Sequence, residues 1–408
     1  MSALSSYRHL FGLSGAGYVI AAYLARLPLA MSQMGTLLLV AGASGSYGAG
    51  GAAAGAMAVT TAIFSPVAGA LTDRIGQRPV LVVQAVTGTV TLVALVLLAR
   101  AEVAWPVLAV VAAVAGAFLP QVGTMARVRW RELAAPRRDR MRLVTAAFSY
   151  EGAADEASFV IGPAAVGVVV ALASPGASLL AAAVLLGVFG LVFALHPTAA
   201  LVTGTDRAAR HTPAPLLTPL LIGLTTGQLL VGMVFGSVQT GTTVLATQAG
   251  QPGLAGVLHG TLGVGSVLAG LTLVLLPPRW HLADRLPVFA GLLALLAVPL
   301  LVVDTLPALT VVLVVLGLAI APYTITIFSL CEKVMPARRL GAAMTLLAAA
   351  TSLGYAAGSS SAGALADLGG HTAAYAVTAG AGVLALVLAL GLRPSLGRAR
   401  RELPDAGA

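Results

Sequence analysis

The sequence predicts an all-α membrane protein with twelve transmembrane helices in two pseudo-symmetric six-helix bundles. Hydrophobic residues make up 58% of the 408 residues, whereas soluble domains contain roughly 45–50%. The mean hydropathy is +0.97, and apolar runs of about 20 residues, the length that crosses a bilayer, recur along the whole chain. Basic residues gather in every second connection, which is typical of a polytopic membrane protein.

The expected spans follow the apolar runs in order. They are 10–41, 47–71, 79–100, 105–128, 143–174 and 177–196, and then 216–247, 253–277, 286–303, 306–331, 340–366 and 372–392. The longest polar stretch separates the sixth span from the seventh. We therefore expect an N-terminal six-helix bundle over 1–196, a cytoplasmic linker over 197–215, and a C-terminal six-helix bundle with a short cytoplasmic tail over 216–408.

The basic residues predict the orientation of the chain. Of the 23 Lys and Arg residues, all but Arg26 and Arg100 lie at the termini or in even-numbered connections. Such residues favour the cytoplasmic side of a membrane. We therefore expect a multi-pass protein of the plasma (inner) membrane with both termini in the cytoplasm.

The composition also excludes several classes of protein. The net charge of +9 lies in loops, and no large polar domain presents it, so no nucleic-acid partner is expected. The single Cys331 excludes intramolecular disulfides and cysteine-based metal cages, and neither a metal nor a cofactor is expected. A phosphate-binding loop of the type G-x-x-x-x-G-K-S/T does not occur, which disfavours ATP-driven transport by this chain alone. We expect a monomer surrounded by membrane lipid.

A charged motif follows the second span. Gly69, Asp73, Arg74, Gly76 and Arg78 match the pattern G-x-x-x-D-R-x-G-x-R, which resembles the cytoplasmic loop signature of the major facilitator superfamily. The resemblance implies two parallel six-helix halves with a substrate site between them near the midplane. It also implies that the charged cluster acts as a latch that closes the cytoplasmic side. The alternative is an ordinary solvated loop.

Three acidic residues, Glu151, Asp155 and Glu156, lie within the fifth span. An ionisable group at membrane depth costs several kcal/mol, roughly 2.5–3.5 each by insertion scales, and is usually functional. Arg26 lies near the middle of the first span, at a similar depth. One arginine cannot neutralise three carboxylates, and burial disfavours a charged carboxyl, so at least one acid is expected to keep its proton. These four residues are the predicted proton-coupling group. The alternative is a static salt bridge between the first and fifth spans.

The fifth span also contains Gly162-Pro163, a predicted kink, which partly resembles the antiporter motif of drug–proton exchangers in the same superfamily. That motif has glycines where this chain has Ser149, Ser158 and Val166, and the arginine usual within the fourth span is absent here. A generic kink without directional meaning is the alternative.

Further polar residues lie on spans that, by the resemblance, line the central cavity: Gln33, Gln121, Gln228, Gln239 and Tyr323. Each is a candidate to hydrogen-bond a substrate, and each suits an interhelical bond equally well. Arg127, Arg129 and Arg131 end the fourth span, where we expect them to set the topology.

Together these features predict a proton-coupled secondary transporter, with a small organic molecule or drug and protons as its partners. Export by antiport and alternating access is the first hypothesis. The alternatives are a proton symporter for uptake and a non-transporting receptor of the same fold. A membrane enzyme is disfavoured, because the embedded acids have neither a histidine pattern for a metal nor an obvious nucleophile beside them.

Overall fold

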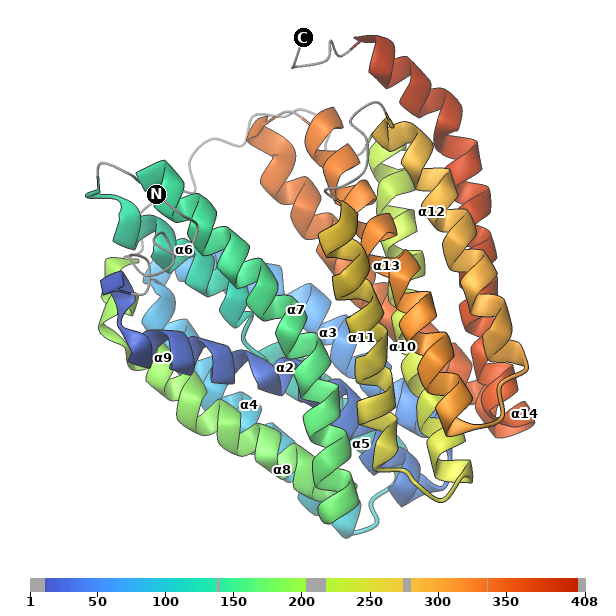
Figure 1. Cartoon of the computed structure of the whole chain (residues 1–408). Coiled ribbons are helices and arrows are strands. Elements are labelled where there is room, and N and C mark those ends of the chain that lie inside the picture. The colour runs from blue at the N-terminus through green and yellow to red at the C-terminus, as the bar shows by residue number, and fades with distance from the viewer. Residues whose placement is uncertain (1–11, 138–139, 203–217, 274–279, 336, 403–408) are drawn as a thin grey trace.

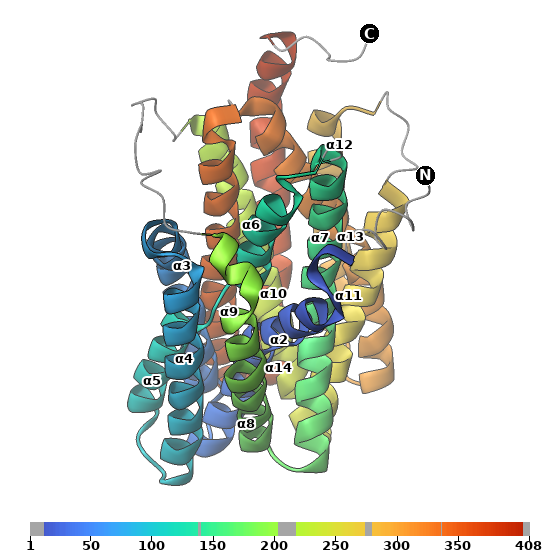
Figure 2. The same cartoon turned by 90° about the vertical axis from the view of Figure 1, so that its left-hand side faces the viewer.

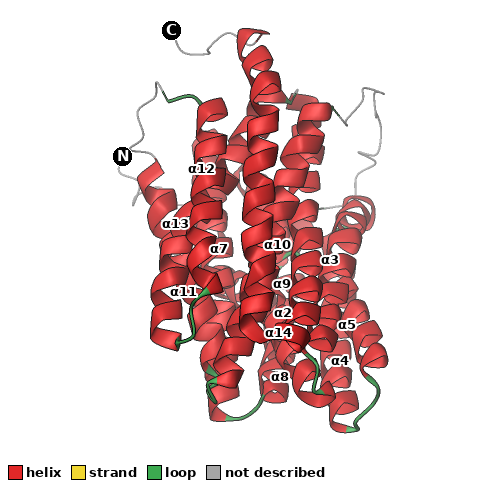
Figure 3. Ribbon diagram, turned by 90° about the vertical axis from the view of Figure 1, so that its right-hand side faces the viewer, coloured by secondary structure: helices red, strands yellow, loops and turns green. Residues whose placement is uncertain are grey.

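The computed structural model describes residues 12–137, 140–202, 218–273, 280–335 and 337–402, and the side chains of Asp73 and Glu156 are outside the description. Within these ranges every regular element is a helix (Figure 3). This confirms the all-α architecture expected from the apolar runs.

The first half of the chain builds one bundle. Its elements are α2 (Ala16–Ser44), α3 (Tyr47–Ile75), α4 (Gln77–Arg100), α5 (Trp105–Phe118), α6 (Val122–Ala134), α7 (Arg140–Leu172), α8 (Pro175–Leu185), the π-helix η1 (Leu186–Gly190), α9 (Leu191–Leu195) and the 3-10 helix η2 (Pro197–Leu201). The predicted linker, 197–215, lies mostly outside the described residues, so the domain boundary stays a prediction.

The second half builds the other bundle. Its elements are α10 (Pro219–Gln248), α11 (Leu254–Thr272), α12 (Leu282–Ala297), the 3-10 helix η4 (Val298–Leu301), α13 (Leu306–Val334) and α14 (Ala337–Glu402). The backbone of α14 is non-helical at Gly369 and Gly370, so this long element is two successive helices. Gly370 has a φ of 67°, a conformation that favours glycine.

By length and hydropathy, nine described helices suffice to cross a membrane. One of these stretches, Leu346–Leu396, is 51 residues long and contains the last two predicted spans. Two shorter apolar helices, Ala157–Leu172 and Leu254–Gly270, correspond to the predicted fifth and eighth spans. The helices therefore match the twelve spans expected from the sequence.

One span differs from its prediction. The fourth was expected to be continuous over 105–128, but it breaks between α5 and α6 at Leu119–Gln121. Pro120 explains the break, because proline disfavours the helical conformation of the residue before it, and Leu119 is extended, with a φ of −74° and a ψ of 117°. The residues that follow on α6 therefore face directions that a continuous helix would not give them.

The two bundles meet at one end and stand apart at the other (Figure 1). Figure 2 shows the molecule with the first bundle toward the viewer. The bundles meet at the end with the short connections 45–46, 173–174 and 249–253, which we call the hairpin end. They stand apart at the opposite end, where α6 and α13 end, which we call the linker end. Contacts across the interface join α3 to α14 and α7 to α11.

Glycines allow the backbones of α7 and α11 to come into direct contact. A Cβ on Gly256 of α11 would lie 1.8 Å from the carbonyl oxygen of Pro163, and one on Gly167 of α7 would lie 2.5 Å from the carbonyl oxygen of Gly253. Small residues at helix interfaces allow this close approach in membranes. Pro163, one of the two predicted kink residues, thus lies at the contact between the bundles.

Candidate functional site

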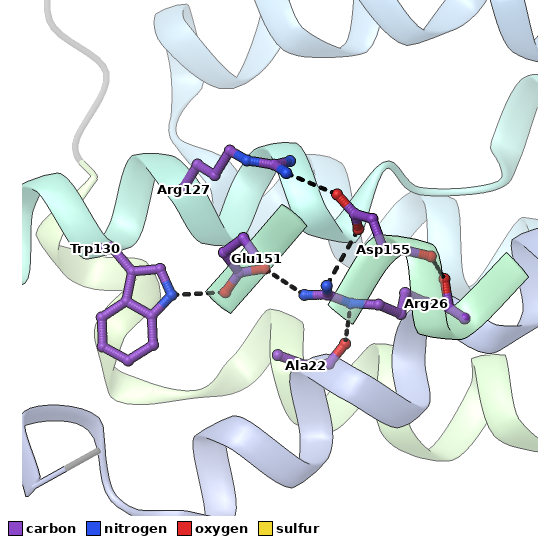
Figure 4. Close-up of polar contacts among 7 residues, drawn as sticks. Ala22, Arg26, Arg127, Trp130, Glu151 and Asp155 are labelled. Atoms are coloured by element: carbon purple, nitrogen blue, oxygen red, sulfur yellow. Dashed lines mark hydrogen bonds and ion pairs between the residues drawn. The ribbon is translucent and has the colours of Figure 1, made fainter. Parts of the chain in front are cut away.

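Arg26 on α2 is the centre of a buried charged cluster (Figure 4). Its side chain is only 3% exposed. Its Nη2 lies 2.5 Å from Oε2 of Glu151 and its Nη1 lies 3.1 Å from Oδ1 of Asp155. Its Nε donates to the carbonyl oxygen of Ala22 at 3.2 Å. One guanidinium therefore bridges two carboxylates that are four residues apart on α7, a spacing that places them on the same helix face.

Glu151 is enclosed on all sides. Its side chain is 0% exposed, and the indole Nε1–H of Trp130 on α6 donates to its Oε1 at 2.6 Å. Both carboxylate oxygens thus have a strong donor, one from α2 and one from α6. Such an arrangement fixes the orientation of Arg26 and joins three helices at one point.

Asp155 is more open. Its side chain is 32% exposed, and its Oδ2 lies 2.8 Å from Nη2 of Arg127 on α6, which is itself 30% exposed. Gly123 on α6 makes room for the carboxylate, because a Cβ there would lie 2.3 Å from Oδ1. Of the two described acids in this cluster, Asp155 is therefore the one that solvent or a ligand can reach.

The face of α7 that carries Asp155 changes from exposed to buried along the helix. At 3.6 residues per turn, Phe159, Val166 and Val170 lie on the same face of α7 as Asp155. Phe159 is 53% exposed, whereas Val166 and Val170, nearer the hairpin end, are buried. This face is therefore open beside Asp155 and closed toward the hairpin end.

The charge balance includes an arginine that the sequence analysis did not count, and the expectation of one protonated acid stays a prediction because the side chain of Glu156 is outside the described residues. The sequence suggested one arginine against three acids, with at least one acid kept protonated. The structure adds Arg127, so Arg26 and Arg127 face Glu151 and Asp155 as two cations and two carboxylates. A protonated carboxyl is not required to balance these four.

The arginines that end the fourth span differ from the expected topology-setting charges. Arg127 is part of the charged cluster, and Arg129 is completely buried. Arg129 donates to Oε1 of Gln77 at 2.8 Å and to the carbonyl oxygen of Phe193 at 2.8 Å. It also donates to the hydroxyl of Thr198 at 3.2 Å and lies 3.8 Å above the ring of Phe193. It therefore joins α6 to the start of α4 and to the beginning of the segment between the bundles.

The five polar residues predicted to line a cavity divide into two groups. Gln33 and Gln121 are half-buried in the first bundle. Gln228, Gln239 and Tyr323 are buried within the second. Gln239 donates from its amide nitrogen to the hydroxyl of Tyr355 at 2.6 Å, which is the interhelical bond offered as its alternative role.

The loop motif lies at the linker end. Gly76 has a φ of 86° and separates α3 from α4, a backbone position that requires glycine. Arg74 and Arg78 are exposed, and a Cβ on Gly69 would meet nothing within 4 Å. No described helix therefore approaches Gly69 closely in this conformation. The side chain of Asp73 is outside the description.

Solved structures share this architecture. The nucleoside transporter NupG superposes with a TM-score of 0.70 at 15% identity, covering 93% of this chain and 98% of the other. A bacterial homologue of the human lysosomal transporter Spinster, in an inward-facing and occupied conformation, gives 0.67 at 14% identity and covers 96% and 98%. A POT family transporter in complex with 5-aminolevulinic acid gives 0.69 at 13% identity and covers 95% and 96%.

At these low identities the likeness establishes the fold alone. No curated protein matches this sequence. The sequence profile of the Major Facilitator Superfamily matches residues 10–301 and 266–408, which together cover almost the whole chain. The chain is therefore an integral membrane protein and not an enzyme, and it belongs to the Major Facilitator Superfamily of transporters.

Proposed function

We propose that this transporter is proton-coupled and exports a small organic molecule by alternating access. The observation that carries the proposal is the bridge from Arg26 to Glu151 and Asp155, deep in the first bundle. Ionisable groups at membrane depth are costly and are characteristic of proton relays and solute pathways. We further propose that it acts as a monomer in the plasma membrane, with the linker end and both termini in the cytoplasm.

Within this proposal the two described acids have different roles. Glu151 is held by Arg26 and Trp130 and is fully buried, so it orients Arg26. Asp155 is one-third exposed and paired with the equally exposed Arg127, so it is the group that exchanges a proton. Protonation removes the charge of Asp155 and weakens its attraction to both arginines, which releases α6 and α7 to rearrange. Deprotonation restores the pairs.

The direction of transport rests on the helix-interface geometry of α7. Gly162 packs against α2, where a Cβ would lie 2.6 Å from Cβ of Ala30. Pro163 packs against α11 of the other bundle. The partial antiporter motif therefore lies between the proton site and the interface that must open and close. This position suits the coupling of the proton site to alternating access, and the partial resemblance to the antiporter motif favours export in exchange for protons.

The test uses proteoliposomes and a substrate found by growth inhibition with the gene over-expressed or deleted. Asp155→Asn is expected to abolish accumulation driven by a pH gradient while energy-independent counterflow continues. Glu156→Gln is tested in parallel, and Asp304→Asn, whose carboxylate is 78% exposed, is the matched control. If Asp155→Asn and Glu156→Gln both keep full gradient-driven accumulation, coupling lies elsewhere. Reversing the gradient distinguishes export from uptake.

A further inference from the structure

Asp367 on α14 bonds to the beginning of α3 in the opposite bundle. Its Oδ2 accepts from the hydroxyl of Ser46 at 2.7 Å and from the backbone N–H of Gly48 at 3.0 Å. Its Oδ1 accepts from the backbone N–H of Tyr47 at 2.8 Å. One carboxylate thus makes three hydrogen bonds across the interface between the bundles.

These contacts complete the N-terminal cap of α3. Ser46 is the N-cap residue, and its hydroxyl accepts from the backbone N–H of Ala49 at 3.1 Å. The first amides of a helix have no partner within the helix. Here the backbone amides of Tyr47 and Gly48 donate to the carboxylate of Asp367. The amide of Ala49 donates to the hydroxyl of Ser46, which in turn donates to Asp367. A negative charge at this position also suits the positive end of the helix dipole.

Small residues bring α3 and α14 close enough for these bonds. A Cβ on Gly51 would lie 2.4 Å from the carbonyl oxygen of Ser359, and one on Gly55 would lie 2.6 Å from the hydroxyl of Ser360. A Cβ on Gly363 would lie 2.5 Å from the carbonyl oxygen of Tyr47. The two helices therefore run in backbone contact from Gly55 to the hairpin end, where Asp367 lies.

We propose that Asp367 is a positioning residue of the transport cycle, which holds the hairpin end closed by capping a helix of the opposite bundle. The inference rests on the proposed alternating access, because its bonds exist only while the two bundles touch at this end. An interaction present in one of two states shifts the equilibrium toward that state. When the hairpin end opens, α3 loses its carboxylate cap and keeps only Ser46.

The experiment measures conformation and not transport. Spin labels replace Ala101 and Gln251, exposed at the hairpin end of each bundle, in a Cys331→Ala background. A second pair, at Arg137 and Lys333, reports on the linker end. Asp367→Ala is expected to raise the ratio of open to closed hairpin end by roughly 3- to 30-fold, the range expected for loss of a helix N-cap. The linker-end pair is expected to move closer.

Three comparisons make the result decisive. Ser46→Ala removes one of the three bonds to Asp367, together with the bond from the N–H of Ala49. It is expected to shift the same ratio less, and it also serves if Asp367→Ala does not fold. Asp304→Asn is the control, because Asp304 bonds at 3.3 Å to His371 of its own bundle. Unchanged distances in Asp367→Ala and Ser46→Ala would overturn the proposal. Failure of proton coupling alone would leave these distances, and hence this inference, intact.

Discussion

The indole of Trp130 and the carboxylate of Glu151 form a hydrogen bond of 2.6 Å in which both partners are almost completely buried. The bond holds α6 against α7, and the other oxygen of Glu151 holds Arg26 of α2. Trp130 therefore stabilises the arginine that also reaches Asp155. The four side chains form one unit, in which the inner pair, Trp130 and Glu151, is fully enclosed, Arg26 is also buried, and only Asp155 is partly exposed.

The first prediction concerns this inner pair. Glu151→Gln is expected to destabilise the purified protein by about 3–5 kcal/mol, because breaking a buried ion pair leaves a charge without its partner. Trp130→Phe loses the hydrogen bond, at an expected cost of about 1–3 kcal/mol, and also part of the buried ring, which adds to that cost. Thermal unfolding in detergent measures both. Equal melting temperatures for Glu151→Gln and Asp155→Asn would contradict the different roles given to the two acids.

The second prediction concerns the space beside Asp155. Gly123→Ala places a methyl group 2.3 Å from Oδ1 of Asp155, which pairs with Arg26, and 2.8 Å from Oδ2, which pairs with Arg127. The change is expected to displace the carboxylate from both arginines at a cost of about 1–3 kcal/mol. Gradient-driven transport is expected to fall while counterflow persists, as for Asp155→Asn. Gly380→Ala is the control, because a Cβ there meets nothing within 4 Å. Normal proton-coupled transport by Gly123→Ala would show that the ion pairs of Asp155, including the one with Arg127, have no part in the mechanism.

The third prediction concerns the loop motif. Nothing lies within 4 Å of a Cβ on Gly69, so Gly69→Leu is expected to leave the present conformation unchanged. If the motif closes the linker end in another state, the leucine blocks that closure, and transport falls about tenfold or more at an overpacking cost of about 1–3 kcal/mol. Gly391→Leu, equally unhindered, is the control. Wild-type transport by Gly69→Leu would reduce the motif to a solvated loop.

The fourth prediction concerns Arg129. Arg129→Met leaves the acceptors of Gln77 and Phe193 without their donor and is expected to lower stability by about 2–4 kcal/mol, since buried polar groups without partners are costly. Arg129→Lys keeps the charge but not the planar set of donors, so it is expected to restore little. Arg137→Gln, exposed after α6, is the control. A melting temperature unaffected by Arg129→Met would indicate that water replaces these bonds.

The fold could be predicted from the sequence because hydropathy and the distribution of basic residues are properties of whole spans. An error at a single residue changes them little. The depth of Arg26 and of the α7 acids was also accessible, since a helix rises 1.5 Å per residue. Their partners were not accessible, because pairing depends on the rotation of each helix. Arg26 lies against Glu151 and Asp155, whereas the sequence analysis grouped all three acids with Arg26 without distinguishing among them.

The roles of Arg127 and Arg129 were missed for a different physical reason. Basic residues near a membrane boundary usually face water, so their charge was assigned to topology. Pro120, however, interrupts the helix just before them. The signal was present in the sequence, since a proline before a charged segment indicates that the preceding residue is not helical. The direction of each side chain after such a break still requires coordinates.

The break between α5 and α6 also separates two sets of contacts within the first bundle. The hydroxyls of Thr60 and Thr61 on α3 donate to the carbonyl oxygens of Ala113 and Gly116, which binds α5 to α3. Beyond Pro120, α6 is bound instead to the charged cluster. A continuous helix would transmit any twist of α6 directly to α5 and on to α3. Because the helix is interrupted, α6 can turn with the charged cluster while α5 stays bound to α3.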